Sequence, residues 1–162
     1  FLPITYIWMI VVGLSVAAGL WFFLNKTKMG IYGKGNQKRQ WIYVEDNTDA
    51  LMKVLESNFN GSTYCIGSKY EIDNLSLVKK ILNILHNKFK IKKKINYSDH
   101  LKFVKDRPGH DLRYFLEYKS FSKKFKWHQN TSMDLGLRKT VEWFLNNPKW
   151  IKQKKSKVIK FF

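Results

Sequence analysis

One run of twenty-one uncharged residues limits what this chain can fold into more than any other feature of its sequence. Residues 4–24 read ITYIWMIVVGLSVAAGLWFFL, and the first charged residue is Lys26. About 20 apolar residues are enough to cross the hydrocarbon core of a bilayer as a helix. Trp8 and Trp21 near the two ends, and lysines that only follow the run, are typical of a membrane span. The run therefore predicts one long apolar helix within residues 1–29, and the alternative is a buried helix of a larger soluble domain.

Every charged residue follows this run, and most of them are basic. The 162 residues include 30 Lys+Arg and 12 Asp+Glu, which gives a formal net charge of +18. So large an excess favours anionic partners such as nucleic acid, acidic lipid or phosphorylated small molecules. The lysines stand in runs, KFKIKKK at 88–94 and KQKKSK at 152–157, and not along a helix that could read a groove. This pattern favours solvated lysine over nucleic-acid binding.

Residues 30–150 have the composition of a soluble α/β domain, and residues 151–162 form a basic tail. Apolar spacing and turn residues predict two strands and three helices. Thr131 or Ser132 is a good N-cap for the last helix, which must end before Pro148. Strands that alternate with helices indicate a mixed α/β structure with a small sheet. The expected strands are 39–46 and 63–67, and the expected helices are 46–57, 74–85 and 132–147.

The residues that could carry chemistry do not form a self-sufficient catalytic site. No Tyr-x-x-x-Lys pair occurs in the sequence. GIYGKG at 30–35 lacks the third glycine of a dinucleotide fingerprint, and we expect neither a strand before it nor a helix after it. The four histidines are too scattered for a metal site, so no metal is expected. Cys65 lies in an apolar stretch and is predicted to be a small core residue, not a nucleophile.

Arginine is scarce in this lysine-rich chain, so an arginine at a given position suggests a specific role there. Its planar fork of donors fits a phosphate with two hydrogen bonds, which a lysine cannot reproduce. Arg39 and Arg107 are therefore candidates for phosphate binding. The alternative is a salt bridge from either arginine to Asp46, Asp106 or Asp111, and composition leaves both options open.

Four blocks of sequence stand in a recognisable order. They are IYGKGNQKRQWIYVEDNTDAL (31–51), STYCIGS (62–68), FVKDRPGHDLRY (103–114) and GLRKTVEWFLNNPKW (136–150). Together they resemble the C-terminal half of dTDP-glucose 4,6-dehydratases, in the extended short-chain dehydrogenase/reductase family. The resemblance covers about residues 30–150. It implies an α/β fold, the C-terminal substrate-binding part of such an enzyme, here preceded by the long apolar helix.

The resemblance also implies a function. These enzymes are NAD-dependent lyases that convert a dTDP-sugar to a 4-keto-6-deoxy sugar, with NAD in an N-terminal domain and the nucleotide-sugar in a C-terminal one. This chain resembles the second part only, so we expect neither NAD binding nor dehydratase activity from it alone. Pro108 and Gly109 would form the turn that aims an arginine at a phosphate. The positions that fall where the family contacts the nucleotide and its diphosphate are Tyr32, Arg39, Asn74, Arg107 and His110.

Other features depart from this family. Residues 4–30, which end in FLNKTKMG, resemble over a short stretch a span of branched-chain amino-acid or urea transport permeases, and Cys65 stands where the family has asparagine. Two other classes stay open, a membrane-anchored basic protein at anionic surfaces and a nucleic-acid-binding module. The homodimer of the family is not assured here. We expect residues 31–162 in the cytoplasm, with the chain held at a membrane if residues 4–24 span it.

Overall fold

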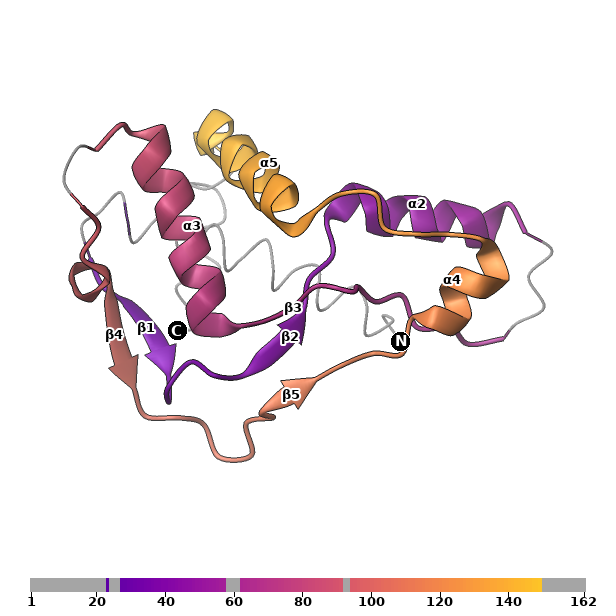
Figure 1. Cartoon of the computed structure of the whole chain (residues 1–162), viewed down its shortest axis with the longest axis horizontal. Coiled ribbons are helices and arrows are strands. Elements are labelled where there is room, and N and C mark those ends of the chain that lie inside the picture. The colour runs from indigo at the N-terminus through magenta and orange to yellow at the C-terminus, as the bar shows by residue number, and fades with distance from the viewer. Residues whose placement is uncertain (1–22, 24–26, 58–61, 92–93, 150–162) are drawn as a thin grey trace.

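A computed structural model of the chain describes residues 23, 27–57, 62–91 and 94–149. At one end of the molecule lie β1, β4 and α3, and at the other lie α2 and α4 (Figure 1). The elements, in chain order, are β1 (Met29–Tyr32), β2 (Lys38–Gln40), α2 (Val44–Leu55), β3 (Glu71–Asp73), α3 (Asn74–Lys88), the 3-10 helix η1 (Tyr97–Asp99), β4 (Leu101–Val104), β5 (Arg113–Tyr114), α4 (Lys119–Phe125) and α5 (Met133–Asn146).

The strands form two small sheets. β1 and β4 pair in parallel, with a register that runs from Met29 opposite Leu101 to Tyr32 opposite Val104. β2 is the middle strand of the second sheet, antiparallel to β3 and parallel to β5. The predicted mixed α/β structure with a small sheet is therefore confirmed in the described residues.

α3 is the helix that joins the parts of the main core. The carboxylate of Asp73 caps it by accepting a hydrogen bond from the amide of Ser76 at 2.8 Å. One side of α3 packs on α5, and another side packs on β1 and β4. The helix predicted over 74–85 is confirmed, and it extends to Lys88 because His86 and Lys88 favour the negative end of the helix dipole. The buried residues of these two contacts are Trp41, Leu77, Ile81, Leu85, Leu137, Val141 and Phe144 on the α5 side, and Ile31, Val78, Leu82 and Leu101 on the strand side.

The last predicted helix is also confirmed. α5 begins at Met133 and ends at Asn146, two residues before Pro148. The hydroxyl of Ser132 accepts a hydrogen bond from the amide of Leu135 at 3.3 Å, so Ser132 is the N-cap and Thr131 is not.

The strand predicted over 39–46 is confirmed only at residues 39–40. β2 ends at Gln40, and α2 begins at Val44, inside the predicted strand. Glu45 and Asp46 lie in the first turn of α2, where negative charge interacts favourably with the helix dipole and stabilises the helix. The interaction of these two charges with the helix dipole favours a helix here over an extended strand.

The strand predicted over 63–67 is absent from the described structure. The stretch is extended enough to alternate its side chains, since Ile66 and the partly buried Tyr64 pack into a cluster with Phe121 of α4. A strand also needs a neighbouring strand to complete its hydrogen bonds. Cys65, between Tyr64 and Ile66, is exposed, so its prediction as a core residue is wrong.

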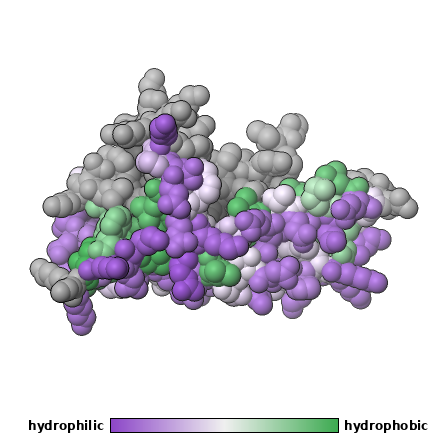
Figure 2. Space-filling model, turned by 90° about the horizontal axis from the view of Figure 1, so that it is seen from above, coloured by the Kyte–Doolittle hydropathy of each residue, from purple (hydrophilic) through white to green (hydrophobic). Residues whose placement is uncertain are grey.

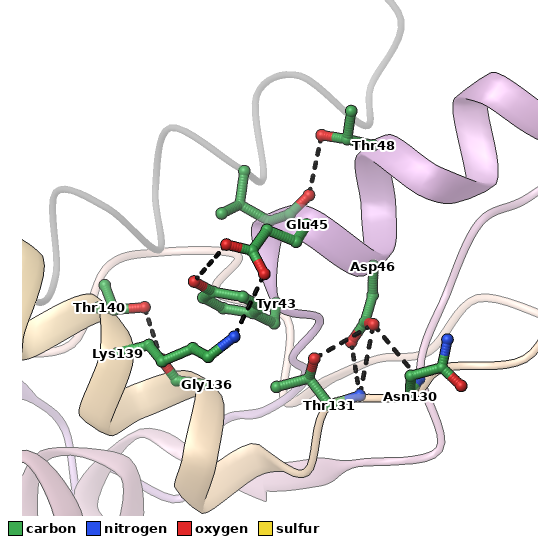
Figure 3. A network of polar contacts seen from close by, with 10 residues as sticks. Tyr43, Glu45, Asp46, Thr48, Asn130, Thr131, Gly136, Lys139 and Thr140 are labelled. Atoms are coloured by element: carbon green, nitrogen blue, oxygen red, sulfur yellow. Dashed lines mark hydrogen bonds and ion pairs between the residues drawn. The ribbon is translucent and has the colours of Figure 1, made fainter.

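A polar network joins the start of α2 to the start of α5 (Figure 3). The buried carboxylate of Asp46 accepts hydrogen bonds from the amide of Thr131 at 3.0 Å and from its hydroxyl at 3.2 Å. Glu45 accepts bonds from the Tyr43 hydroxyl and from Lys139, each at 3.2 Å. The network fixes the starts of α2 and α5 relative to each other, although the bonded residues are more than eighty positions apart in sequence.

One face of α2 carries exposed apolar side chains. Val44, Met52 and Leu55, which we call the α2 face, are 49%, 46% and 75% exposed. Seen from above, hydrophilic residues cover much of the described surface, and apolar patches lie among them, one of them at the α2 end (Figure 2). The exposed apolar side chains of α2 therefore form a patch within a largely hydrophilic surface.

The predicted membrane span, residues 4–24, lies outside the described residues apart from Phe23, as does the basic tail from residue 151. The ring of Phe23 stacks on Phe89 and on His100, with centroids 5.8 and 5.3 Å apart. Within the part of the chain that the structure describes, none of the helices is both long and apolar enough for a membrane span. The membrane association stays a prediction.

Candidate functional site

The candidate site lies where β1 and β4 end. The two strands are parallel, so the loops that follow Tyr32 and Val104 leave the sheet at the same edge. The amide of Gly33 still bonds the carbonyl of Val104 at 2.9 Å, and this bond holds the two loops together. In open α/β sheets this carboxyl edge is where ligands bind.

The loop after β4 makes a tight turn over residues 107–110. Pro108 and Gly109 are its two central residues, and the amide of His110 bonds the carbonyl of Arg107 at 3.3 Å. Gly109 has φ +66°, and a proline followed by a residue with positive φ is the pattern of a type II turn. The turn predicted at Pro108-Gly109 is therefore present, and it places Arg107 and His110 side by side.

Three of the predicted site residues come together around this turn. The guanidinium carbon of Arg107 lies 5.4 Å from the centroid of the Tyr32 ring. The ring of His110 meets the Tyr32 ring edge to face, with centroids 6.1 Å apart. An arginine over an aromatic face is held by cation–π attraction, which limits the positions its fork can take. Arg107 itself stays exposed, so its donors can reach a ligand.

Asp106, the residue before the turn, connects these residues through hydrogen bonds to its carboxylate. Its carboxylate accepts hydrogen bonds from the His110 Nδ1 at 2.7 Å, from the Arg107 amide at 2.8 Å and from the Gln37 side chain at 2.8 Å. The hydrogen bond with His110, before the others, lowers the pKa of the Asp106 carboxyl below its usual value. We call Tyr32, Gln37, Asp106, Arg107 and His110 the turn cluster.

Arg39 adjoins this cluster from β2. It is 9% exposed, and its guanidinium donates to the carbonyls of Lys38 at 2.7 Å and Asp111 at 2.9 Å. Burial lowers the pKa of its guanidinium, the charge of Asp111 raises it in part, and the charge of Arg107 lowers it further. A bound anion would offset the repulsion between these two positive charges.

Asn74 approaches the cluster through its backbone. It is the first residue of α3, and its amide donates to the carbonyl of Gln37 at 3.1 Å. The next amide, of Leu75, donates to the carbonyl of Gly35 at 2.9 Å. The start of α3 is thus bonded to the loop between β1 and β2, and Asn74 is partly buried beside it.

The glycines of that loop do not fit a dinucleotide. A strand, β1, does precede them, contrary to expectation, but β2 follows them where a dinucleotide site requires a helix. Gly33 and Gly35 have φ +55° and +72°. A Cβ on Gly33 would lie 2.7 Å from the carboxylate of Asp106, and one on Gly35 would lie 2.9 Å from the Cβ of Leu75. The space beside these glycines is filled by the chain itself, whereas the glycines of a dinucleotide site let a phosphate approach the backbone.

The sequence analysis did not identify Gln37 and Asp106 as parts of the site. Asp106 was considered only as a salt-bridge partner for an arginine, whereas it bonds His110 and a backbone amide. Gln37 gave no signal, since a glutamine in a polar loop is usually exposed, and here it is 1% exposed. In the described part of the chain no group of three or more His, Cys, Asp or Glu residues could hold a metal ion.

Comparisons with known proteins identify relatives of the chain. Residues 22–140 match the family described as GDP-mannose 4,6 dehydratase. A dTDP-glucose 4,6-dehydratase of Escherichia coli is 40% identical over 133 residues, which are 82% of this chain and 36% of the relative. A dTDP-glucose 4,6-dehydratase of Haemophilus influenzae is 40% identical over 126 residues, or 72% of this chain and 35% of the relative. The chain thus spans about a third of the length of these relatives.

Solved structures show the same similarity. A dTDP-glucose 4,6-dehydratase from Bacillus anthracis in complex with NAD has a TM-score of 0.73 and 28% identity, covering 85% of this chain and 41% of the other. The enzyme from Streptomyces venezuelae with NAD and TYD bound has a TM-score of 0.72 and 28% identity, covering 82% and 38%. These matches confirm the resemblance to dTDP-glucose 4,6-dehydratases.

Proposed function

The chain belongs to the GDP-mannose 4,6-dehydratase family, and we propose that it forms the substrate-binding part of a dTDP-glucose 4,6-dehydratase. The observation that carries this proposal is the position of Arg107. Its guanidinium is exposed over the Tyr32 ring, beside His110, at the carboxyl edge of the parallel strand pair. The relatives with 40% identity are enzymes of this name.

The chemistry of the cluster suits a nucleoside diphosphate. An arginine fork can bind two phosphate oxygens at once, and the ring of His110 lies beside Arg107 against the same Tyr32 ring. Arg39 contributes positive charge from β2, where its guanidinium is held by the carbonyls of Lys38 and Asp111. In this proposal Arg107 contacts the diphosphate with His110 beside it, Arg39 supports them, and Tyr32 and Asn74 contact the nucleotide.

We propose that dehydration requires parts of the enzyme that this chain does not represent. NAD supplies hydride transfer in this family, and two structural relatives were solved with NAD bound. The 162 residues contain no Tyr-x-x-x-Lys pair, and the glycine loop is filled by Asp106 and Leu75. The chain alone would therefore bind the sugar nucleotide without converting it.

A ligand series tests this function. The full chain is titrated with dTDP, thymidine and inorganic pyrophosphate, and binding is followed by calorimetry or ligand-observed NMR. We expect dTDP to bind at least about tenfold more tightly than thymidine, because hydrogen bonds to charged groups contribute about 1.5–3 kcal/mol. Equal affinities for dTDP and thymidine would rule out a diphosphate site. Equal affinities for dTDP and pyrophosphate would reduce the site to one for any polyanion.

A further inference from the structure

Asp106 is negatively charged, which is unfavourable beside a site that would bind a negatively charged phosphate. A carboxylate next to a bound diphosphate repels it, and a site that used charge alone would have no acid there. Yet Asp106 directly precedes Arg107 and accepts three hydrogen bonds. Its contribution to the site must therefore come from the groups that hydrogen-bond to it.

The first group that Asp106 holds is the ring of His110. The Nδ1 of His110 lies 2.7 Å from Asp106 Oδ1, and the His110 side chain is only 7% exposed. A carboxylate at Nδ1 fixes the orientation of an imidazole and the proton on that nitrogen. The Nε2, on the opposite side of the ring, is then the nitrogen available to a ligand, and in the neutral ring it accepts a hydrogen bond.

The second group is the backbone of the turn. The same Oδ1 accepts a hydrogen bond from the Arg107 amide at 2.8 Å. This bond ties the first residue of the turn to Asp106, so the side chain of Arg107 leaves the backbone in one direction, toward the Tyr32 ring.

Gln37 holds Asp106 in turn. Its side chain is almost fully buried and donates from Nε2 to Asp106 Oδ2 at 2.8 Å. The bond joins the loop after β1 to the loop after β4, across 69 positions of sequence. Gly33 lies against the same oxygen, and a Cβ there would come within 2.7 Å of it. The loop after β1 is thus shaped around the carboxylate of Asp106.

From these contacts we infer that Asp106, clamped by Gln37, is a positioning residue that presents Arg107 to the diphosphate and fixes the ring of His110 beside it. This inference rests on the proposed function of the turn cluster. The inference predicts a direction of change in dTDP affinity, on loss of Asp106, that electrostatics alone would not give. Loss of a negative charge beside an anion site should strengthen anion binding, whereas loss of a positioning residue should weaken it.

Two charge-matched variants separate these effects. Asp106→Ala and Asp134→Ala each remove one negative charge, and Asp134 is an exposed residue of α5 that pairs with Lys80 at the surface. We expect Asp106→Ala to weaken dTDP binding about tenfold, and Asp134→Ala to leave it unchanged or slightly stronger. An unchanged or tighter affinity for Asp106→Ala would overturn the inference while leaving the proposed function in place.

A second variant and a ligand-free measurement complete the test. Gln37→Met keeps the size of the buried side chain and removes its donor, so it should weaken dTDP binding in the same direction by about threefold. The 15N shifts of His110 should show Nδ1 protonated in the wild-type chain, and a mixture of tautomers in Asp106→Ala. The same His110 tautomer in both proteins would contradict the inference, whether or not the chain binds dTDP. A failure to bind dTDP would by itself refute only the proposed function.

Discussion

The turn cluster and the α2 face both place side chains at the surface, but they differ in how these side chains are held. In the turn cluster one carboxylate accepts three hydrogen bonds, and an aromatic ring supports the exposed arginine. The side chains of the α2 face are apolar and 46–75% exposed. The difference teaches that exposure alone does not identify a site. Side chains that hold each other in fixed positions do so more reliably.

The first prediction compares a buried leucine with an exposed one. Leu85 of α3 is 0% exposed and packs against α5, whereas Leu55 of the α2 face is 75% exposed. We expect Leu85→Ala to lower the free energy of unfolding by about 2–5 kcal/mol, since it leaves a cavity. Leu55→Ala should change it by less than about 0.5 kcal/mol. Urea unfolding followed by circular dichroism measures both, and a comparable loss for Leu55→Ala would show that the α2 face is packed.

The second prediction compares two glycines near the turn cluster. Gly33 has φ +55°, and a Cβ there would collide with Asp106, whereas Gly109 has φ +66° and nothing within 4 Å. Gly109→Ala should lower the free energy of unfolding by about 1–2 kcal/mol, from backbone strain alone. Gly33→Ala should lower it by about 2–3 kcal/mol, because Asp106 must also move. The same unfolding assay applies, and equal losses would mean that Asp106 is not fixed beside Gly33.

The third prediction compares backbone amides at the two ends of the molecule. The amides between β1 and β4 are paired in a strand ladder, whereas the stretch 63–67 near α2 forms no strand in the described structure. We expect the amides of Thr63 and Cys65 to exchange with solvent at least about tenfold faster than the paired amides of β1 and β4. Hydrogen exchange by NMR measures this, and equal protection would show that 63–67 is paired in solution.

The smallest effect concerns acid. The pKa of Asp106 is lowered in the folded chain, chiefly by the hydrogen bond with His110. Its contribution to stability is therefore complete above the unfolded pKa of about 3.9 and is lost as the pH falls through the lower folded pKa. The stability difference between the wild-type chain and Asp106→Asn should shrink on acidification. Leu55→Ala, which changes no ionisable group, should keep a constant difference. A constant difference for Asp106→Asn as well would contradict this assignment.

The helices with strong local signals could be predicted from the sequence. α3 and α5 each have a cap at one end, Asp73 or Ser132, and an apolar stripe that repeats at helical spacing. Both signals lie within the segment itself. The sequence also gave the turn at Pro108-Gly109, because proline and glycine restrict the backbone locally.

The strands could not be predicted in the same way. β1, β4 and β5 are four residues or fewer, and each depends on a partner far away in the sequence. The stretch 63–67 was predicted as a strand with Cys65 in the core, but its apolar residues do not reveal whether a neighbouring strand exists. Asp106 and Gln37 were missed for a related reason, since their bond spans 69 positions and neither residue has a local pattern.

The most direct test of the account is the affinity of the full chain for dTDP when single arginines are removed. Arg107 belongs to the turn cluster, and Arg138 is an exposed arginine of α5. Both Arg107→Ala and Arg138→Ala remove one positive charge from a chain of net charge +18. We predict that Arg107→Ala weakens binding about ten- to a hundredfold, that Arg107→Lys restores little of it, and that Arg138→Ala has almost no effect. Equal losses for Arg107→Ala and Arg138→Ala would show that dTDP is attracted by the overall charge and that the turn cluster is not its site.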